Sequence, residues 1–337
     1  PVQWAPSGYT RIFGFLGNPN FESAFMGIFA SACFAKLISG KVDTWKALAN
    51  FSFIISSLWV IWSSESTQGY LVFLVGAASA MTIRIQVIAN QTLKIVWYVI
   101  SLSGLTGVVL GMLQKGPLSQ LLYKDSIAYR GDYWRAGWKM TLEHPFSGVG
   151  LDSYGDWYRR ARTVEATLRR GPDIVSNAAH NVLLDLSSNG GFPLLIIYLF
   201  MMFLVVAAAI KVVKRSAGFD PVFAGLFAVW IAYQAQSIIS LNQLGLAVWG
   251  WIISGLIIGY EINTREIEVV QKQGAKGKSA SALAAQKVMP ITAVGMFVGF
   301  IVGIALGVPP LRIALRHILP NAIGPLVVAA PFIVGGA

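Results

Sequence analysis

The sequence predicts an all-α polytopic membrane protein with about eight or nine transmembrane helices and one large external, partly helical loop. Three observations lead to this fold class. Of the 337 residues, 55% are hydrophobic and only 12% are charged, whereas soluble domains average about 25% charged residues. Several apolar runs have the length of about 20 residues that crosses a bilayer. The segment 114–191 between two such runs is rich in charged residues.

Eight apolar runs are candidate transmembrane helices, and 69–83 is the shortest of them. They are 21–39, 47–63, 69–83, 95–113, 192–213, 221–239, 244–260 and 288–308, with a ninth possible span at 318–337. We therefore expect a loop with four spans over 1–113, a large external loop over 114–191, three spans over 192–260, a basic cytoplasmic linker over 261–287 and C-terminal spans over 288–337.

Lysine and arginine predict the orientation of these spans. Basic residues gather in the connections after the first, third, fifth and seventh spans, while the connections 64–68 and 240–243 contain none. Basic connections face the cytoplasm, so the loop 114–191 is expected outside. Its ten basic residues do not contradict this, because long loops translocate largely regardless of charge. The net charge of +11 thus needs no nucleic-acid partner.

The two ends of the chain give further expectations. Residues 1–20 resemble a loop entered midway, so we expect N-terminal helices to be missing. Cys33 is the single cysteine and lies in an apolar run, which excludes an intrachain disulfide and a cysteine-based metal site. The C-terminal stretch 307–337 resembles a fragment of the permease of peptide-type ABC transporters.

Any chemistry is expected in the loop 114–191, which contains eight of the 15 acidic residues and two of the three histidines. Its stretch 129–145 predicts a helix. One face of this helix has large apolar residues at every fourth position, Trp134, Trp138 and Leu142. Arg130 lies one turn earlier on that face, and Arg135 begins a basic stripe. The helix either rests in the membrane interface or directs Arg130 to an anionic partner.

A second helical pattern covers 156–170 and is rich in arginine. On a continuous helix, four guanidinium groups would fall within a third of the circumference, those of Arg159, Arg162, Arg169 and Arg170. Such a face suits phosphate or diphosphate, because the planar guanidinium can bind two oxygens at once. The alternative is a face exposed to solvent or lipid headgroups. Before this pattern, Gly148 and Gly150 are expected to permit close backbone approach.

His180 lies at the mouth of a predicted membrane helix. Residues 179–189 predict a short helix at the outer surface, and Asn189-Gly190-Gly191 predicts a left-handed stop before the span. His180 could accept a proton from a sugar hydroxyl there, or it could be a capping or interfacial histidine. His144, His180 and the nearby carboxylates lack a metal-ligand spacing, so no metal or other cofactor is expected.

Four stretches follow one another in an order that resembles a known family. They are GNPNFESAFMGIF (17–29), SSESTQGYLVFLVG (63–76), RGDYWRAGWKMTLEHPFSGVGLDSY (130–154) and AHNVLLDLSSNGGFPLLIIYL (179–199). The third combines arginine, tryptophan and a Pro-x-x-Gly-x-Gly pattern, and the fourth has His-Asn-x-x-Leu before a membrane helix. Over about 17–260 the chain thus resembles the O-antigen ligase and polymerase family of bacterial membrane glycosyltransferases.

The resemblance implies a reaction and its partners. Such enzymes transfer glycan from a polyprenyl-diphosphate carrier in the bacterial inner membrane to a glycan, lipid or protein acceptor outside, without a metal or a nucleotide sugar. The family's functional histidine corresponds to His180 and its arginine to Arg130. The residues expected to bind the diphosphate are Arg159, Arg162, Arg135 and Gln68.

Two other classes of function stay open at this stage. A transporter related to bicarbonate or peptide uptake would place ionisable residues near the bilayer midplane, whereas these spans are nearly free of charge. A non-catalytic scaffold would use 114–191 as a binding module and would need neither a base at His180 nor clustered arginines. The concentration of charge in one external loop favours a membrane glycosyltransferase.

Overall fold

The computed structural model describes residue 14 and residues 16–40, 42–88, 90–112, 115–116 and 125–272. The regular structure of these residues is helical. The chain forms two compact units, 1–258 and 259–337, and the second is described only to Lys272, as the end of one helix. The predicted spans 288–308 and 318–337, most of the predicted linker and the permease-like stretch lie outside the described residues.

Seven long helices match the predicted spans from 21–39 to 244–260. They are α1 (Pro19–Leu37), α2 (Thr44–Ser63), α3 (Gln68–Ile88), α4 (Gln91–Met112), α9 (Val182–Arg215), α10 (Pro221–Ile239) and α11 (Leu244–Lys272). Of the helices in the described part of the chain, six are long and apolar enough to cross a membrane. This confirms a polytopic membrane protein. The short predicted run 69–83 lies within the 21-residue helix α3, which is longer at both ends.

α1 is the long helix that is not among these six. Polar residues in its first and last turns, such as Glu22 and Lys36, lower its mean hydropathy. It packs against α2, α3 and α10 instead of standing apart in the bilayer. Small residues permit this packing: a Cβ atom added at Gly27 would lie 2.5 Å from the Gly69 carbonyl oxygen of α3.

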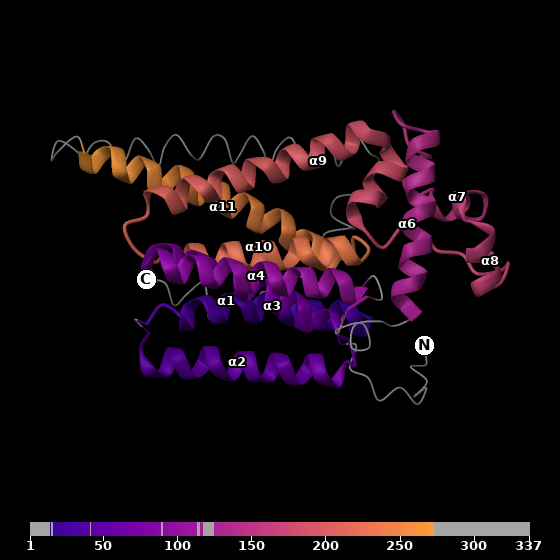
Figure 1. The fold of residues 1–337 in the computed structure, drawn as a ribbon. Helices are drawn as coiled ribbons and strands as arrows, with labels where there is room; N and C mark the ends of the chain where they lie inside the picture. Colours follow the sequence, from indigo (N-terminus) through magenta and orange to yellow (C-terminus); the bar gives the residue numbers. More distant parts are fainter. Residues whose placement is uncertain are drawn as a thin grey trace, which may run out of the picture. The chain divides into compact units, whose positions relative to one another are not determined.

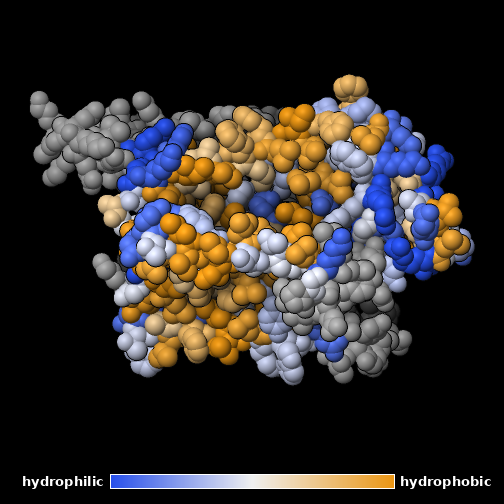
Figure 2. Space-filling view, viewed as in Figure 1, coloured by the Kyte–Doolittle hydropathy of each residue, from blue (hydrophilic) through white to orange (hydrophobic). Residues whose placement is uncertain are grey.

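The outward faces of the long helices are apolar. Large side chains such as Trp59 on α2, Leu102 on α4 and Phe203 on α9 are more than half exposed. Figure 2 shows this apolar surface over the long helices, with hydrophilic residues gathered toward the ends. An apolar surface of this extent is unfavourable in water and is expected in contact with lipid.

Consecutive long helices run in alternating directions (Figure 1). The short connections 64–67 and 240–243 therefore lie at the same end of the bundle as residues 125–181. Asparagine and aspartate caps begin several helices, and Asn18 accepts a hydrogen bond of 2.8 Å from the backbone of Asn20 at the start of α1. Such caps satisfy N–H groups that the first helical turn leaves without a partner.

Residues 125–181 form a helical module that we call the loop module. It contains α6 (Asp125–Glu143), α7 (Tyr154–Ala161) and α8 (Val164–Arg170), and α6 runs across the end of the long helices in Figure 1. The helix predicted over 129–145 is confirmed as α6. The prediction of one continuous helix over 156–170 is wrong. The backbone is extended at Arg162 and Thr163, so the four arginines do not share one helix face.

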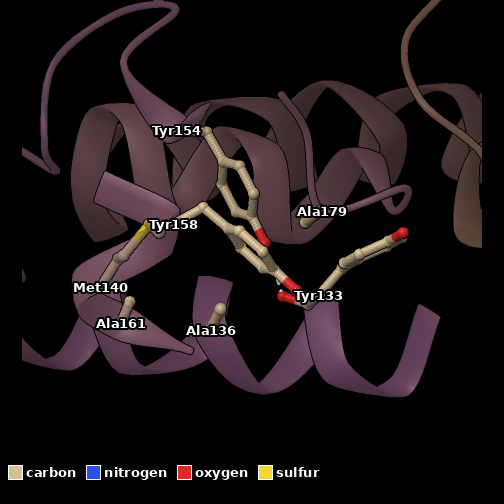
Figure 3. Packing of buried hydrophobic residues seen from close by; sticks show 7 residues of the cluster. All are labelled: Tyr133, Ala136, Met140, Tyr154, Tyr158, Ala161 and Ala179. Carbon is tan, nitrogen blue, oxygen red and sulfur yellow. Dashed lines mark hydrogen bonds between the residues drawn. The ribbon is translucent and has the colours of Figure 1, made fainter. Parts of the chain in front are cut away.

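The loop module has its own small core (Figure 3). Its buried members are Tyr133, Ala136, Met140, Tyr154, Tyr158, Ala161 and Ala179. The hydroxyl of Tyr154 donates a 2.7 Å hydrogen bond to the backbone carbonyl of Tyr133, which ties α7 to α6. The buried face of α6 is therefore the one with Tyr133 and Met140. The tryptophan face is more open, and Trp138 is 46% exposed.

We predict that Gly27→Ala destabilises the helix bundle by about 1–3 kcal/mol, because the added methyl group overlaps the α3 backbone and forces α1 away. Thermal unfolding in nanodiscs measures the effect. Gly104→Ala on α4 is the matched control, since no atom lies within 4 Å of the added carbon. Equal unfolding temperatures for the two variants would contradict the close α1–α3 contact.

Candidate functional site

His180 lies in the turn that precedes α9. The predicted helix over 179–189 begins later than expected, at Val182, with Asn181 as its N-cap. The Asn181 side chain accepts hydrogen bonds from the backbone of Leu183 and Leu184. His180 itself has φ +54°, a left-handed conformation that is uncommon for residues other than glycine. The turn, and not a helix, therefore sets the direction of the imidazole.

The turn is held in place by a side chain of the helix that follows. The backbone N–H of Ala179 donates a 2.5 Å hydrogen bond to Asp185 Oδ1. At the far end of this first helical segment, Gly191 has φ +70° and kinks α9. The left-handed stop predicted at Asn189-Gly190-Gly191 is thus confirmed. It separates 182–190 from the longer apolar segment that follows.

Two arginines and a tyrosine surround His180. Its ring stacks on Tyr133 of α6, with 5.2 Å between centroids and 26° between planes. Arg170 donates to the Tyr133 hydroxyl and lies 4.3 Å over the ring of Tyr129. Burial, followed by the positive charges of Arg130 and Arg170, lowers the pKa of His180 to about 4. The imidazole is therefore neutral near pH 7 and can accept a proton.

Arg130 is a partly buried cation with no anionic partner in the part of the chain that the structure describes. Its Nη2 donates a long hydrogen bond of 3.5 Å to Gln68 Oε1, at the start of α3. Among the described residues, no carboxylate lies within ion-pair distance of this guanidinium. Burial lowers the pKa of Arg130, because removal from water disfavours the charged form. A bound anion would restore the lost stabilisation of the charge.

The other predicted arginines have different surroundings. Arg135 and Arg169 both pair with the buried carboxylate of Asp132, at 2.8 and 2.9 Å. Arg162 donates to backbone carbonyls of the segment after α8, those of Pro172 and Ile174 among them. Arg159 is exposed on α7. The structure therefore places Arg130 beside Gln68 and close enough to His180 to act on it electrostatically. Arg135 and Arg162 are engaged in contacts within the loop module.

Sequence reasoning did not single out Arg170 and assigned no role to Tyr133. Arg170 was one of four arginines in a basic pattern, and nothing in that pattern distinguished it from Arg169. The two tyrosines that hold it, Tyr129 and Tyr133, are one helical turn apart on α6. Arginine with tyrosines at i and i+4 is a cation–π arrangement, but the pairing crosses from α8 to α6 and so depends on the tertiary fold.

A glycine-rich turn of the loop module, residues 145–150, packs against the backbone of α9. Val149 N–H donates to Ser188 O at 2.8 Å, and Phe192 N–H donates to Pro145 O at 2.7 Å. The two backbones lie so close that a Cβ atom at Gly148 would be 2.3 Å from the Asn189 carbonyl carbon. The expected close approach at Gly148 is confirmed. The Pro-x-x-Gly-x-Gly stretch and the Asn-Gly-Gly stretch are therefore two sides of one contact, which we call the backbone junction.

We expect His180 to titrate at about pH 4 and Arg170→Ala to raise its pKa, because this change removes a nearby positive charge. NMR titration of labelled histidine, assigned with His180→Gln, measures both values. Arg159→Ala is the control, because Arg159 does not contribute to the lowered pKa. The folded state binds this proton less readily than the unfolded state, so stability should fall as pH drops from about 6.5 to about 4. A titration midpoint near pH 6.5 for His180 in the wild type would contradict the expected low pKa.

Gly148→Ala should destabilise the backbone junction by at least about 2 kcal/mol. The alanine would have to adopt φ +64° and its Cβ would overlap the backbone of α9. Protease resistance of the loop module and thermal unfolding measure the loss. Gly131→Ala in α6 is the matched control, because its Cβ meets no atom within 4 Å and alanine favours a helix. Similar resistance of both variants would argue against a tight junction.

Residues 51–199 match the family model described as O-antigen ligase. No curated protein matches the chain. The matched segment contains Gln68, Arg130 and His180 and three of the four stretches on which the sequence resemblance rests. The resemblance to the O-antigen ligase and polymerase family is thus confirmed. Together with the six candidate membrane helices, it indicates a multi-pass membrane protein with a general function in glycan transfer.

Proposed function

We propose that this chain, with its O-antigen ligase match over residues 51–199, transfers glycan from a polyprenyl-diphosphate carrier to an acceptor hydroxyl. The reaction takes place at the outer face of the bacterial inner membrane and uses no metal. One observation supports this above all: Arg130, partly buried and without a carboxylate partner among the described residues, lies near a neutral histidine, His180. A diphosphate supplies the missing anion, and the histidine can accept the proton of the hydroxyl.

The roles follow from the bonds that change. The bond between the anomeric carbon of the glycan and the diphosphate oxygen breaks, and the diphosphate leaves with the electron pair. A new bond forms between that carbon and the acceptor oxygen, whose proton passes to the imidazole of His180. Arg130 stabilises the negative charge that grows on the leaving diphosphate. Arg170, which also acts on His180 electrostatically, adds a second positive charge.

The binding of the donor strengthens the base. In the free protein the positive charges of Arg130 and Arg170 contribute to the low pKa of His180. A diphosphate between these groups offsets both charges, so the pKa of the imidazole rises when the donor is bound. His180 thus becomes a better proton acceptor in the complex that is ready to react.

The remaining predicted residues differ in how readily they could bind diphosphate. Gln68 already contacts Arg130 through its Oε1, and it would have to turn its NH₂ group away from Gln236 to bind a phosphate oxygen directly. Arg159 is exposed and could meet a carrier that approaches along the loop module. Arg135 and Arg162 would first have to leave Asp132 and the carbonyls after α8, so we assign them the smaller contributions.

His180→Ala should lower the rate of glycan transfer by about 10²- to 10⁴-fold, the usual effect of removing a general base. Arg130→Ala should lower the rate and should also weaken the binding of the donor. Transfer from a polyprenyl-diphosphate-linked glycan to acceptor, measured in nanodiscs, tests both. Lys139→Ala is the control, because its side chain is half exposed and its distance to Glu143 is 3.9 Å. Undiminished transfer by His180→Ala would refute the assigned base.

A further inference from the structure

The contact of Arg130 with Gln68 continues into the membrane helices. Gln68 is the first residue of α3, and its Nε2 donates to Gln236 Oε1 near the end of α10. Both glutamines are buried, with 6% and 1% of their surfaces exposed. α3 also packs along α10. A chain of polar groups therefore links the arginine of the loop module to two helices of the bundle.

The direction of each amide in this chain is set by the arginine. A guanidinium has donors only, so Gln68 must turn its Oε1 toward Arg130. Its NH₂ group then faces the bundle, where an acceptor is needed because a buried donor without a partner is costly. Gln236 Oε1 is that acceptor. If the acceptor were absent, Gln68 would gain by turning its NH₂ group elsewhere, and its oxygen would leave Arg130.

We propose that Gln236 is a positioning residue: through Gln68 it holds Arg130 in the orientation that binds the diphosphate of the carrier. This inference rests on the proposed function, because it concerns the same site. Gln236 lies outside the segment that matches the O-antigen ligase family, which ends at residue 199. It acts on the reaction through two other side chains and does not itself touch the reacting atoms.

The second polar atom of Gln236 supports this role. Its Nε2 is buried and has no hydrogen-bond partner among the described residues. Such a donor is unfavourable inside a bundle, and an apolar residue of similar size would avoid it. Glutamine at this position is therefore best explained by the hydrogen bond that its Oε1 accepts from Gln68. A simple polar contact between α3 and α10 would hold the helices together without any effect on Arg130, and experiment can separate the two roles.

Binding of undecaprenyl diphosphate to the full chain in nanodiscs tests the proposal. Gln236→Met removes the acceptor at similar volume and should weaken binding about 10-fold. Gln236→Glu keeps an acceptor oxygen toward Gln68 and should bind as the wild type does. Gln234→Met is the matched control on the same helix, because Gln234 contacts Tyr198 and Met202 of α9. Its binding should be unchanged.

A second variant pair separates positioning from a structural role. In an Arg130→Ala background, Gln236→Met should cause no further loss, because the residue through which it acts is gone. The same additional loss in both backgrounds would overturn the proposal. If Gln236→Met does not fold, Gln236→Asn withdraws the acceptor by one methylene and should show the same weakening and the same coupling to Arg130.

The outcomes also separate this inference from the proposed function. If Arg130→Ala binds undecaprenyl diphosphate as tightly as the wild type, or if the wild type does not bind, the proposed function is wrong and the inference is wrong with it. If Arg130→Ala weakens binding while Gln236→Met and Gln236→Asn do not, the diphosphate site stands and the positioning role alone is overturned.

Discussion

The backbone junction between the glycine-rich turn at 145–150 and the segment 188–192 is the contact on which the candidate site depends. Paired backbone hydrogen bonds join Val149 to Ser188 and Phe192 to Pro145. Because one partner is a loop directly after α6 and the other belongs to α9, the junction ties the loop module to a membrane helix. The same helix begins two residues after His180, so the junction helps to fix where the imidazole meets the tyrosines of α6.

Electrostatics around His180 follow from this placement. α6 contributes Arg130 and Tyr133, and α8 contributes Arg170, which donates a hydrogen bond to the Tyr133 hydroxyl. Positive charge collects around a ring that is partly buried, and the ring is neutral as a consequence. Other arginines of the loop module form an ion pair with Asp132 or donate hydrogen bonds to backbone carbonyls. Arg130 differs from these arginines, because no carboxylate among the described residues lies within ion-pair distance of it.

Much of the membrane architecture could be predicted from the sequence. Apolar runs of bilayer length and the alternation of basic connections predict helices and their directions, because these properties are summed over many residues and do not depend on any one contact. Local signals were equally informative where a residue has few options. Asn189-Gly190-Gly191 predicted the kink of α9 because glycine adopts positive φ at little cost. The periodicity of 129–145 predicted α6, but the tryptophan face that stood out is not the buried one.

The sequence by itself determined that this is a helical membrane protein with a charged module between two membrane helices, and its motifs indicated the resemblance to O-antigen ligases and the pair Arg130 and His180. Only the tertiary structure decided which arginines have partners. The pattern over 156–170 could not show the break at Arg162, because Arg162 donates to carbonyls more than nine residues away. Nor could the sequence single out Arg170 or Gln236. Both residues contact side chains from distant parts of the chain, and these contacts decide which group donates and which accepts each hydrogen bond.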